Sequence, residues 1–542
     1  NDQGTRASYV VSDTSKYRTL VVPNFVPEFV QAQNIRRGWA EQKLYIAETG
    51  ANRLNSHEIK LPAHEGVSSF RRSTWTPDGA HLLVDRMDRD TKRRQLYYVR
   101  NAGTAEEKVI LVTEETDDKW QAPLSNIFEP HPTDPNTLFF ASERDGYSHL
   151  YLATVNPEAG TANIRQLTNG NWQVEWARWT NAGQILYSST EAGYTGRELY
   201  LLDPASGRKG MLESPEKGMK DNFVLSENKG EQTVVFEHSK WNQPGDIYAQ
   251  RVCSPCSKPN APIRLTNTVP KEFMARKWQV PQFIEIDSSD GKKIPAKIYL
   301  PAGFNKQKKY PMAIFVHGAG YLQNVINGWN NYYREFMFNQ LLTQRGYVVL
   351  DIDYRGSAGY GRDWRTDVHD FLGGKDYDDH IDSIDHMVAN YAVDPTKVGV
   401  YGGSYGGFMA GMLVMRAPDK IAAAAALRSV FDWKNYYATN PGYTAQRLGF
   451  PDKNAEAYKR SSPITYAEQL ERPLLILHGM VDDNVHVQDS IQLIEKLIRL
   501  GKTKHFEAMM YPSESHAFVR PESWADEYER IQWFFERHLE NR

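Results

Sequence analysis

Ser404 is the residue of this sequence with the clearest catalytic context. It is the central residue of a G-x-S-x-G pattern in the segment VGVYGGSYGGFMAG (398–411), with glycine at 402, 403, 406 and 407. An apolar run precedes the pattern and small residues follow it, which predicts a nucleophile elbow, a strained turn between a strand and a helix. Glycines are needed there because a Cβ would collide with the adjoining elements. The alternative is a glycine-rich turn with an ordinary N-cap serine.

A serine nucleophile needs a histidine base and a carboxylate that orients the histidine. Downstream of Ser404, the apolar run LLILHG leads into a loop with Asp482 and Asp483, and FEAMMY leads into a loop with His516. This is the order Ser, Asp, His of α/β-hydrolases. Spacing does not separate the two aspartates, and we favour Asp482 because it is nearer the strand end.

Acyl transfer also needs two hydrogen-bond donors for the oxyanion. The amide of Tyr405, directly after the nucleophile, is expected to be one of them. The loop 317–321 (HGAGY) follows an apolar strand and should supply the other, since its small residues let backbone donors approach. A plain tight turn is the alternative.

The elements that must position these residues alternate between strand and helix. Apolar runs at 312–316, 347–352, 398–402, 474–479 and 506–511 alternate with helical patterns such as 488–500. The last helix should place Trp524, Tyr528, Ile531, Phe535 and Leu539 on one face. This alternation predicts an α/β-hydrolase domain over residues 269–542, with a doubly wound, mostly parallel sheet.

Residues 1–268 show a different pattern, a repeat of about 50 residues. A Leu-Tyr or Ile-Tyr pair recurs with its tyrosine at positions 45, 97, 151, 200 and 248. Turn formers followed by a short apolar strand precede four of the pairs, as in TPDGAHLLV. Several strands per repeat predict an all-β propeller with about five visible blades, and a generic β-sandwich is the alternative.

Composition narrows the class of partner. The 542 residues carry 64 Lys and Arg against 67 Asp and Glu, a net charge of −3, which argues against a nucleic-acid partner and favours small or peptidic substrates. No apolar stretch is long enough for a membrane span, and the start NDQGTRASYVV indicates a processed or truncated chain. Cys253 and Cys256, the only cysteines, form either a local disulfide or two free thiols. No metal or other cofactor is expected.

Four motifs together resemble the prolyl oligopeptidase family of serine peptidases, especially its dipeptidyl peptidase IV and acylaminoacyl-peptidase branches. They are GGSYGG, DYRGSAGYG (353–361), HGMVDDNVH (478–486) and SESHAF. In this family the first aspartate of the DDNV-like loop is catalytic, which supports Asp482. The resemblance also implies that segment 429–449 and the DDNV-like loop form a proline pocket. Its residues would be Val430, Trp433, Tyr436, Tyr443 and Val485 with Tyr405, and Asn484 would hold a substrate carbonyl.

The sequence departs from this family in two places. Dipeptidyl peptidase IV relatives have an oxyanion tyrosine where this chain has His317, and acylaminoacyl peptidases have HGGP where it has HGAG. The second oxyanion donor is therefore backbone near Gly318, the side chain of His317 or the hydroxyl of Tyr321. Family propellers usually have seven or eight blades, so the propeller is reduced or upstream blades are missing.

We therefore predict a serine peptidase that cleaves short peptides through an acyl-enzyme and releases dipeptides after Pro or Ala. Acylaminoacyl-peptidase or oligopeptidase action, a carboxylesterase, and a catalytically inert propeller that binds a partner are the alternatives. Association with a second copy of the chain, as a homo-oligomer, is left open by the sequence. We expect a secreted or periplasmic location, with the cytoplasm as the alternative.

Overall fold

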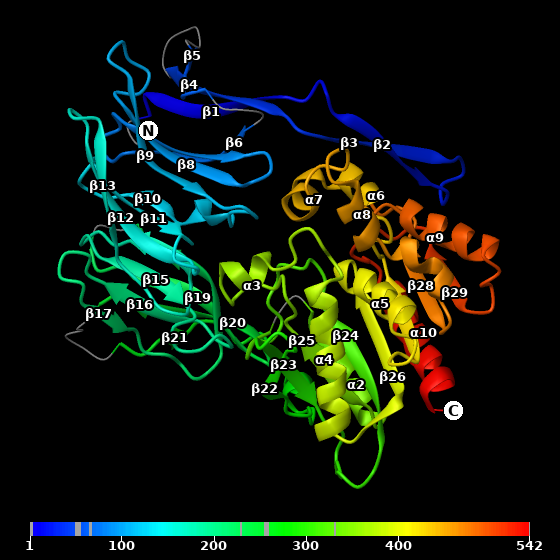
Figure 1. The fold of residues 1–542 in the computed structure, drawn as a ribbon. Helices are drawn as coiled ribbons and strands as arrows, with labels where there is room; N and C mark the ends of the chain where they lie inside the picture. The colour runs from blue at the N-terminus through cyan, green and yellow to red at the C-terminus, as the bar shows by residue number, and fades with distance from the viewer. Residues whose placement is uncertain are drawn as a thin grey trace.

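The structure is a computed structural model that describes residues 4–48, 56–63, 68–227, 230–253, 260–329 and 332–540. An all-β N-terminal half lies beside a C-terminal half in which strands and helices alternate (Figure 1). This confirms the predicted fold class.

The N-terminal half is a series of antiparallel sheets, and each sheet after the first is built from four strands that are consecutive in the chain. The first sheet has three strands: β1 (Arg6–Asp13), β4 (Glu41–Glu48) and β5 (Ser56–Glu58). The second comprises β6 (Ser68–Trp75), β7 (Leu82–Asp88), β8 (Arg93–Arg100) and β9 (Lys108–Thr116). The third comprises β10 (Phe128–Pro130), β11 (Thr137–Ser142), β12 (His149–Asn156) and β13 (Thr161–Gln166), after the 3₁₀ turn η1 (Leu124–Asn126). The fourth comprises β14 (Val174–Trp179), β15 (Ile185–Ser189), β16 (Glu198–Leu202) and β17 (Lys209–Met211). The fifth comprises β18 (Met219–Leu225), β19 (Thr233–Lys240), β20 (Gln243–Arg251) and β21 (Ile263–Arg264).

Neighbouring sheets share their apolar cores, as propeller blades do. One cluster joins Leu83 and Tyr98 of the second sheet to Phe140 of the third, and another joins Phe139 of the third to Tyr187 of the fourth. The repeated tyrosines at 97, 151, 200 and 248 all lie in the third strand of their sheets. The five propeller-like sheets thus correspond to the five predicted repeats, and the alternative of a β-sandwich does not agree with five separate sheets.

A long hairpin of β2 (Arg18–Asn24) and β3 (Gln31–Arg37) leaves the first sheet and reaches across the C-terminal half (Figure 1). The backbone oxygen of Val21 lies 3.0 Å from Nε2 of His486. The hairpin therefore connects the first propeller unit to the loop that carries Asp482.

The C-terminal half is built on one eight-stranded sheet of order β22-β23-β25-β24-β26-β27-β28-β29. Its strands are β22 (Gln282–Asp287), β23 (Lys293–Tyr299), β24 (Tyr310–Val316), β25 (Val348–Ile352), β26 (Val393–Gly403), β27 (Ala423–Leu427), β28 (Leu474–Gly479) and β29 (Phe506–Tyr511). From β25 to β29 all neighbours are parallel, while β22 and β23 are antiparallel.

Helices cover both faces of this sheet. Met312, Ile314 and Val316 of β24 belong to one core cluster, whereas the alternating Ala313 and Phe315 belong to the other. The longer helices are α2 (Tyr333–Gln344), α4 (Lys375–Asn390), α5 (Tyr405–Arg416), α7 (Pro441–Leu448), α9 (Gln488–Arg499) and α10 (Pro521–Phe535). The shorter ones are α1 (Lys271–Met274), α3 (Arg362–Thr366), α6 (Trp433–Thr439) and α8 (Ala455–Ser461), with a 3₁₀ turn η2 (Pro463–Gln469) and a π turn η3 (Glu536–Glu540).

The buried face of the last helix is the predicted one, since Ile531, Phe535 and Leu539 are fully buried. Leu539 lies in η3, so the α-helix ends before the last residue of its apolar pattern.

The domain division at 268 stays a prediction; β21 ends at Arg264 and the eight-stranded sheet begins at Gln282. Among the described residues, no helix is both long and apolar enough to cross a bilayer. Cys253 is disulfide-bonded, and Cys256 lies outside the described residues.

Candidate active site

Ser404 occupies the turn between β26 and α5 with φ 60° and ψ −116°. This conformation is costly for a residue with a Cβ and persists only where the surroundings enforce it. The neighbouring glycines provide those surroundings, because a Cβ on Gly402 or Gly406 would lie 2.3 Å or 2.0 Å from the backbone oxygen of Val316. The elbow geometry predicted from the G-x-S-x-G pattern is therefore present.

Asp482 and His516 come from loops that follow β28 and β29 at the same edge of the sheet. Nδ1 of His516 lies 2.8 Å from Oδ2 of Asp482. The other carboxylate oxygen accepts the backbone N–H groups of Asn484 and Val485, both at 2.9 Å. Asp482 is thus fully buried, with both of its oxygens in hydrogen bonds.

The charge on Asp482 is stabilised by its neighbours. Burial alone would raise the pKa of this carboxyl, but the facing His516 and hydrogen bonds from His478 and His516 outweigh burial and lower the pKa. Asp483 instead accepts a hydrogen bond of 3.3 Å from the hydroxyl of Ser515. The geometry therefore pairs His516 with Asp482 rather than with Asp483.

The three candidates for the second oxyanion donor lie in different surroundings. His317 is fully buried, and its ring nitrogens lie 2.9 Å from the backbone oxygen of Gly318 and 3.0 Å from Oγ of Ser357. Tyr321 is 48% exposed, with its ring near that of Tyr443. Neither side chain is therefore held at the nucleophile by the contacts it makes.

Another residue, Tyr332, contacts the loop 317–321, and the sequence did not point to it. Its hydroxyl accepts the N–H of Gly318 at 2.7 Å. A Cβ built on Gly318 would lie 2.7 Å from this hydroxyl oxygen and 3.5 Å from Cβ of Ser404. Burial, followed by the neighbouring Glu335, raises the pKa of the Tyr332 hydroxyl, so it remains a hydrogen-bond donor.

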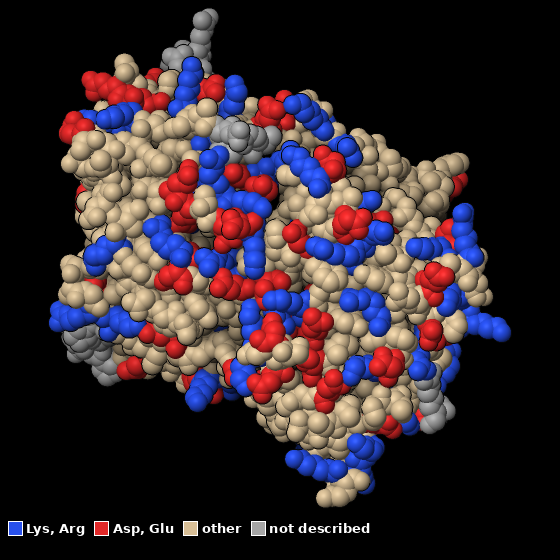
Figure 2. Space-filling model, in the orientation of Figure 1, with Lys and Arg blue, Asp and Glu red and all other residues tan. Residues whose placement is uncertain are grey.

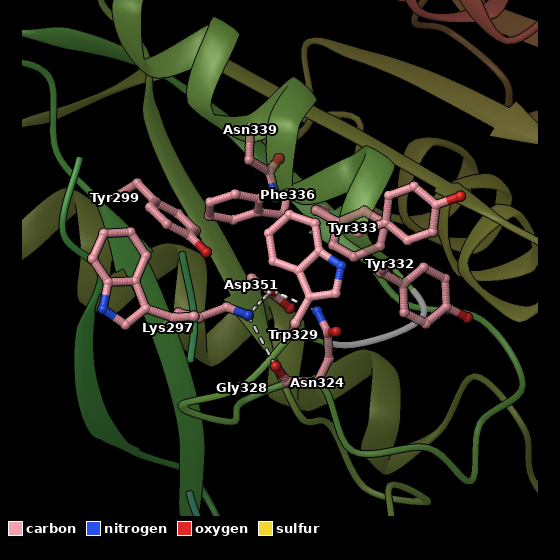
Figure 3. A pocket seen from close by; sticks show the side chains of 12 residues that line it. Lys297, Tyr299, Asn324, Gly328, Trp329, Tyr332, Tyr333, Phe336, Asn339 and Asp351 are labelled. Atoms are coloured by element: carbon pink, nitrogen blue, oxygen red, sulfur yellow. Dashed lines mark hydrogen bonds and ion pairs between the residues drawn. The ribbon is translucent and has the colours of Figure 1, made fainter. Parts of the chain in front are cut away.

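Tyr332 also lines a small pocket (Figure 3). The ammonium of Lys297 lies there 2.9 Å from the backbone oxygen of Asn324 and 3.2 Å from a carboxylate oxygen of Asp351. The pocket volume is about 10 Å³, which is no more than a single water needs. This region is therefore a packed support for the Tyr332 segment and not a substrate site.

The predicted pocket residues form one aromatic cluster beside the elbow. The ring of Trp433 lies 5.9 Å from that of Tyr405, 5.6 Å from that of Tyr436 and 6.2 Å from that of Tyr443. The hydroxyl of Tyr436 donates to the side-chain oxygen of Asn484 at 3.2 Å. Val430 and Val485 are buried in the same core cluster. The structure thus brings the aromatic residues assigned to the pocket together with Asn484, while Val430 and Val485 lie in the large core cluster that also contains Tyr405 and Trp433.

A cavity of about 650 Å³ opens next to this cluster, between the propeller-like half and the C-terminal half. Its lining includes Tyr321 and Tyr443 from the C-terminal half of the chain and Trp39 and Trp120 from the N-terminal half. On the face seen in Figure 2, charged side chains of both signs gather along the boundary between the two halves.

Comparison with known proteins agrees with both halves of the fold. Residues 334–542 match the prolyl oligopeptidase family, and residues 2–244 match the dipeptidyl peptidase IV (DPP IV) N-terminal region. The chain belongs to the prolyl oligopeptidase family. The family match of residues 334–542 supports the predicted class of enzyme, a serine peptidase hydrolase.

Individual relatives of the family are similar over most of the chain. Dipeptidyl peptidase 8 of Mus musculus is 26% identical over 518 residues, which is 85% of this chain and 56% of the relative. Dipeptidyl aminopeptidase BIII of Pseudoxanthomonas mexicana is 27% identical over 604 aligned positions, covering 96% of this chain and 83% of the relative. The crystal structure of Porphyromonas gingivalis dipeptidyl peptidase 4 superposes with a TM-score of 0.86 at 24% identity, covering 99% of this chain and 73% of that chain, and supports the fold. The chain spans little more than half the length of several of the curated relatives it matches.

Tyr332 could not be identified from the sequence, and the reason is physical. Its hydroxyl reaches Gly318 from 14 residues further along the chain, across a loop that has no periodic pattern. The aromatic run WNNYYREF at 329–336 was the only signal in that region.

Proposed function

We propose that this chain is a serine peptidase that cleaves short peptides through an acyl-enzyme and releases dipeptides after Pro or Ala. The observation that carries the proposal is the strained elbow at Ser404, at the same edge of the parallel sheet as an Asp482–His516 pair joined at 2.8 Å. Relatives named dipeptidyl peptidases support the exopeptidase specificity.

The geometry suggests how each residue acts. Asp482 accepts the Nδ1–H of His516, which leaves Nε2 free to take the Ser404 proton as Oγ attacks the scissile carbonyl. The same nitrogen then gives this proton to the leaving amine. Water hydrolyses the acyl-enzyme by the reverse roles and regenerates the serine.

The oxyanion would be held by the amide of Tyr405 and the hydroxyl of Tyr332. Tyr405 is the first residue of α5, so its N–H is one of the helix N–H groups that have no partner within the helix. The Tyr332 oxygen accepts the N–H of Gly318, and its protonated hydroxyl is the group that would donate to a developing negative charge.

Tyr332→Phe tests the second donor. We expect kcat to fall about 10²- to 10³-fold, because loss of one oxyanion donor costs this much, while KM changes little. Tyr333→Phe removes the neighbouring hydroxyl and is the matched control, with kcat within about threefold of wild type. Steady-state kinetics that show equal effects of the two substitutions would remove Tyr332 from the mechanism.

The aromatic cluster is suited to a proline or alanine side chain. Flat rings of Trp433, Tyr436 and Tyr443 offer an apolar slot in which a pyrrolidine ring is held by burial and dispersion. Asn484, oriented by Tyr436 and Asn440, can donate from its amide to a substrate carbonyl.

One observation favours a second candidate, an acylaminoacyl-peptidase or oligopeptidase that accepts blocked peptides. A free substrate amine needs an available carboxylate. In the described lining of the cavity the carboxylates are Glu143 and Glu175, and each already binds an arginine, Arg365 and Arg197 respectively.

Hydrolysis of a Gly-Pro amide, its N-acylated form and an acetyl-Ala amide separates these candidates, with Ser404→Ala as the control. Cleavage of only the free-amine substrate supports dipeptide release, whereas preference for blocked substrates supports the second candidate. A faster rate on aryl esters than on all amides would instead make the chain a carboxylesterase. If all activity persists in Ser404→Ala, the proposed nucleophile is not the one used.

Two further points stay predictions. Association with a second copy of the chain can be measured by sedimentation of the purified protein. A secreted or periplasmic location, rather than a cytoplasmic one, can be tested by fractionation of the native cells.

A further inference from the structure

The cavity between the two halves has an excess of positive charge. Five arginines line it, namely Arg71, Arg89, Arg197, Arg365 and Arg447, against two carboxylates in the described lining. A cavity with walls of low dielectric concentrates such a field, and the field selects for ligands of opposite charge.

The two glutamates do not neutralise all of the arginines. Oε2 of Glu143 lies 2.5 Å from Nη2 of Arg365, and Oε1 of Glu175 accepts from Nη2 of Arg197 at 2.7 Å. No described carboxylate lies within 4.0 Å of the guanidinium groups of Arg71, Arg89 or Arg447. Three cations are therefore left without an ion-pair partner in the part of the cavity that the structure describes.

Arg447 is the best placed of these. It is 3% exposed, and its guanidinium carbon lies 3.7 Å from the centroid of the Tyr443 ring. Its Nη1 donates to the backbone oxygen of Tyr443 and to Oε1 of Gln446, both at 3.1 Å, but its buried Nε has no partner. Because Tyr443 also belongs to the aromatic pocket, Arg447 lies one ring away from the proposed site of the scissile residue.

A second buried arginine also has an unused donor. Arg365 is 9% exposed, and its Nη1 has no hydrogen-bond partner although Nη2 binds Glu143. The guanidinium carbons of Arg365 and Arg447 lie 5.4 Å and 5.2 Å from the centroid of the same Trp120 ring. A buried N–H that lacks an acceptor is costly, so both groups favour an acceptor supplied by a ligand.

The remaining arginines are accessible. Arg89 lies over the rings of Phe450 and Trp39, with its guanidinium carbon 4.0 Å and 5.2 Å from their centroids. Arg71 has an exposed side chain. Arginines held on aromatic rings keep their N–H edges free for a carboxylate, which they bind in a two-pronged geometry.

We propose that this cavity binds a carboxylate carried by the substrate, so that acidic peptides are the preferred substrate class. The location of the site relies on the proposed peptidase function, but carboxylate binding itself does not require catalysis. The carboxylate can come from an acidic side chain next to the scissile residue or from the C-terminus of a short peptide.

The test compares kcat/KM for Glu-Ala, Gln-Ala and Lys-Ala aminomethylcoumarin amides. We expect Glu-Ala to exceed Gln-Ala by about tenfold, as hydrogen bonds to charged groups imply, with Lys-Ala the poorest. Arg71→Gln and Arg447→Gln should each bring the Glu/Gln ratio close to one. Because Arg447 is buried and its variant can misfold, the exposed Arg71 keeps the test decisive. Arg208→Gln, at an exposed position outside the cavity lining, should leave the ratio unchanged.

A second arm identifies the source of the carboxylate. Cleavage of Gly-Pro-Ala as the free acid is compared with cleavage of its C-terminal amide. A preference for the acid that disappears in Arg71→Gln supports the inference with the chain end as the source, and a preference for Glu over Gln supports it with the side chain as the source. Absence of both preferences overturns the inference and leaves the peptidase function intact.

Calorimetric binding to Ser404→Ala separates the inference from the proposed function. Tighter binding of the dipeptide Glu-Ala than of Gln-Ala, lost in the Ser404→Ala, Arg71→Gln double variant, supports the carboxylate site even if wild type cleaves no peptide. Equal binding of the two dipeptides, together with equal turnover of the Glu and Gln substrates and no preference for the free acid over the C-terminal amide, contradicts it.

Discussion

The candidate catalytic residues differ in how far local sequence determines them. Ser404 and His516 follow from a glycine pattern and from chain order, because Ser404 lies directly after a recognisable strand and His516 lies in the loop that follows another. The choice between Asp482 and Asp483 does not follow from spacing, since adjacent residues in a loop point in different directions. The choice rests on the hydrogen bond of 2.8 Å between Asp482 and His516.

Asp482→Asn tests this assignment. The asparagine Oδ1 can still accept the N–H groups of Asn484 and Val485, so its Nδ2 would face His516 and favour the wrong imidazole tautomer. We expect kcat to fall about 10⁴-fold, with little loss of folding. Asp483→Asn is the matched control and should stay within about threefold of wild type. Equal losses in the two variants would refute the assignment of Asp482.

Residues that act across long sequence separations could not be predicted. Tyr332 reaches Gly318 across a loop, and Glu143 meets Arg365 across the two halves, 222 residues apart. Neither pair has a period or spacing that a sequence pattern can show. By contrast, segment 429–449 was assigned by resemblance, and its aromatic rings do cluster beside the elbow.

At the scale of elements, apolar runs predicted the central strands well. The runs at 312–316, 347–352, 398–402, 474–479 and 506–511 correspond to β24, β25, β26, β28 and β29. The strand between β26 and β28 was missed because β27 reads AAAAL, and alanine is depleted in strands. β27 forms because it is fully buried between two strands that supply its hydrogen bonds.

One buried carboxyl links helix α9 to the segment that precedes α6 and should make stability depend on pH. Oδ1 of Asp489 accepts the backbone N–H groups of Phe431 and Asp432 at 2.8 and 2.7 Å. Burial raises the pKa of Asp489 to about 8, against 3.8 for the unperturbed group. The bound proton therefore favours the folded state, and this contribution is fully present below about pH 4 and lost as pH rises through about 8.

Asp489→Asn should remove this dependence while its oxygen keeps both backbone hydrogen bonds. We expect the Tm of wild type, relative to that of the variant, to fall by a few degrees between pH 5 and pH 8.5. Calorimetry at the two pH values measures this difference. A Tm difference between the two proteins that is the same at both pH values would contradict the proposed burial of a protonated Asp489.

At the scale of the whole molecule, the two halves are joined by polar contacts around the cavity. The loop after β11 supplies Glu143, which binds Arg365, and Gly146, whose backbone oxygen accepts the N–H of Arg362 at 2.7 Å. On another side, the N–H of Asn327 donates to the backbone oxygen of Thr195 at 2.7 Å. The sequence predicted the two halves but not how they face each other, because these contacts involve loops.

Glu143→Gln should weaken this interface strongly, because it leaves the buried Arg365 with an uncompensated charge. Such a loss costs about 3–5 kcal/mol, and urea unfolding should show a lower midpoint. Glu158→Gln is the matched control, because Glu158 pairs with Arg100 at the surface and should contribute less than about 1 kcal/mol. Equal midpoints for the two variants would show that the Glu143–Arg365 pair does not hold the halves together.

Covalent labelling is the direct test of whether Ser404 is an activated nucleophile. Wild type and Ser404→Ala are treated with a fluorophosphonate, and the modified peptide is located by mass spectrometry. We expect one adduct, on Ser404, formed in parallel with loss of peptidase activity and slowed by His516→Gln. An unlabelled wild type, or labelling of Ser404→Ala at the wild-type rate, would contradict it.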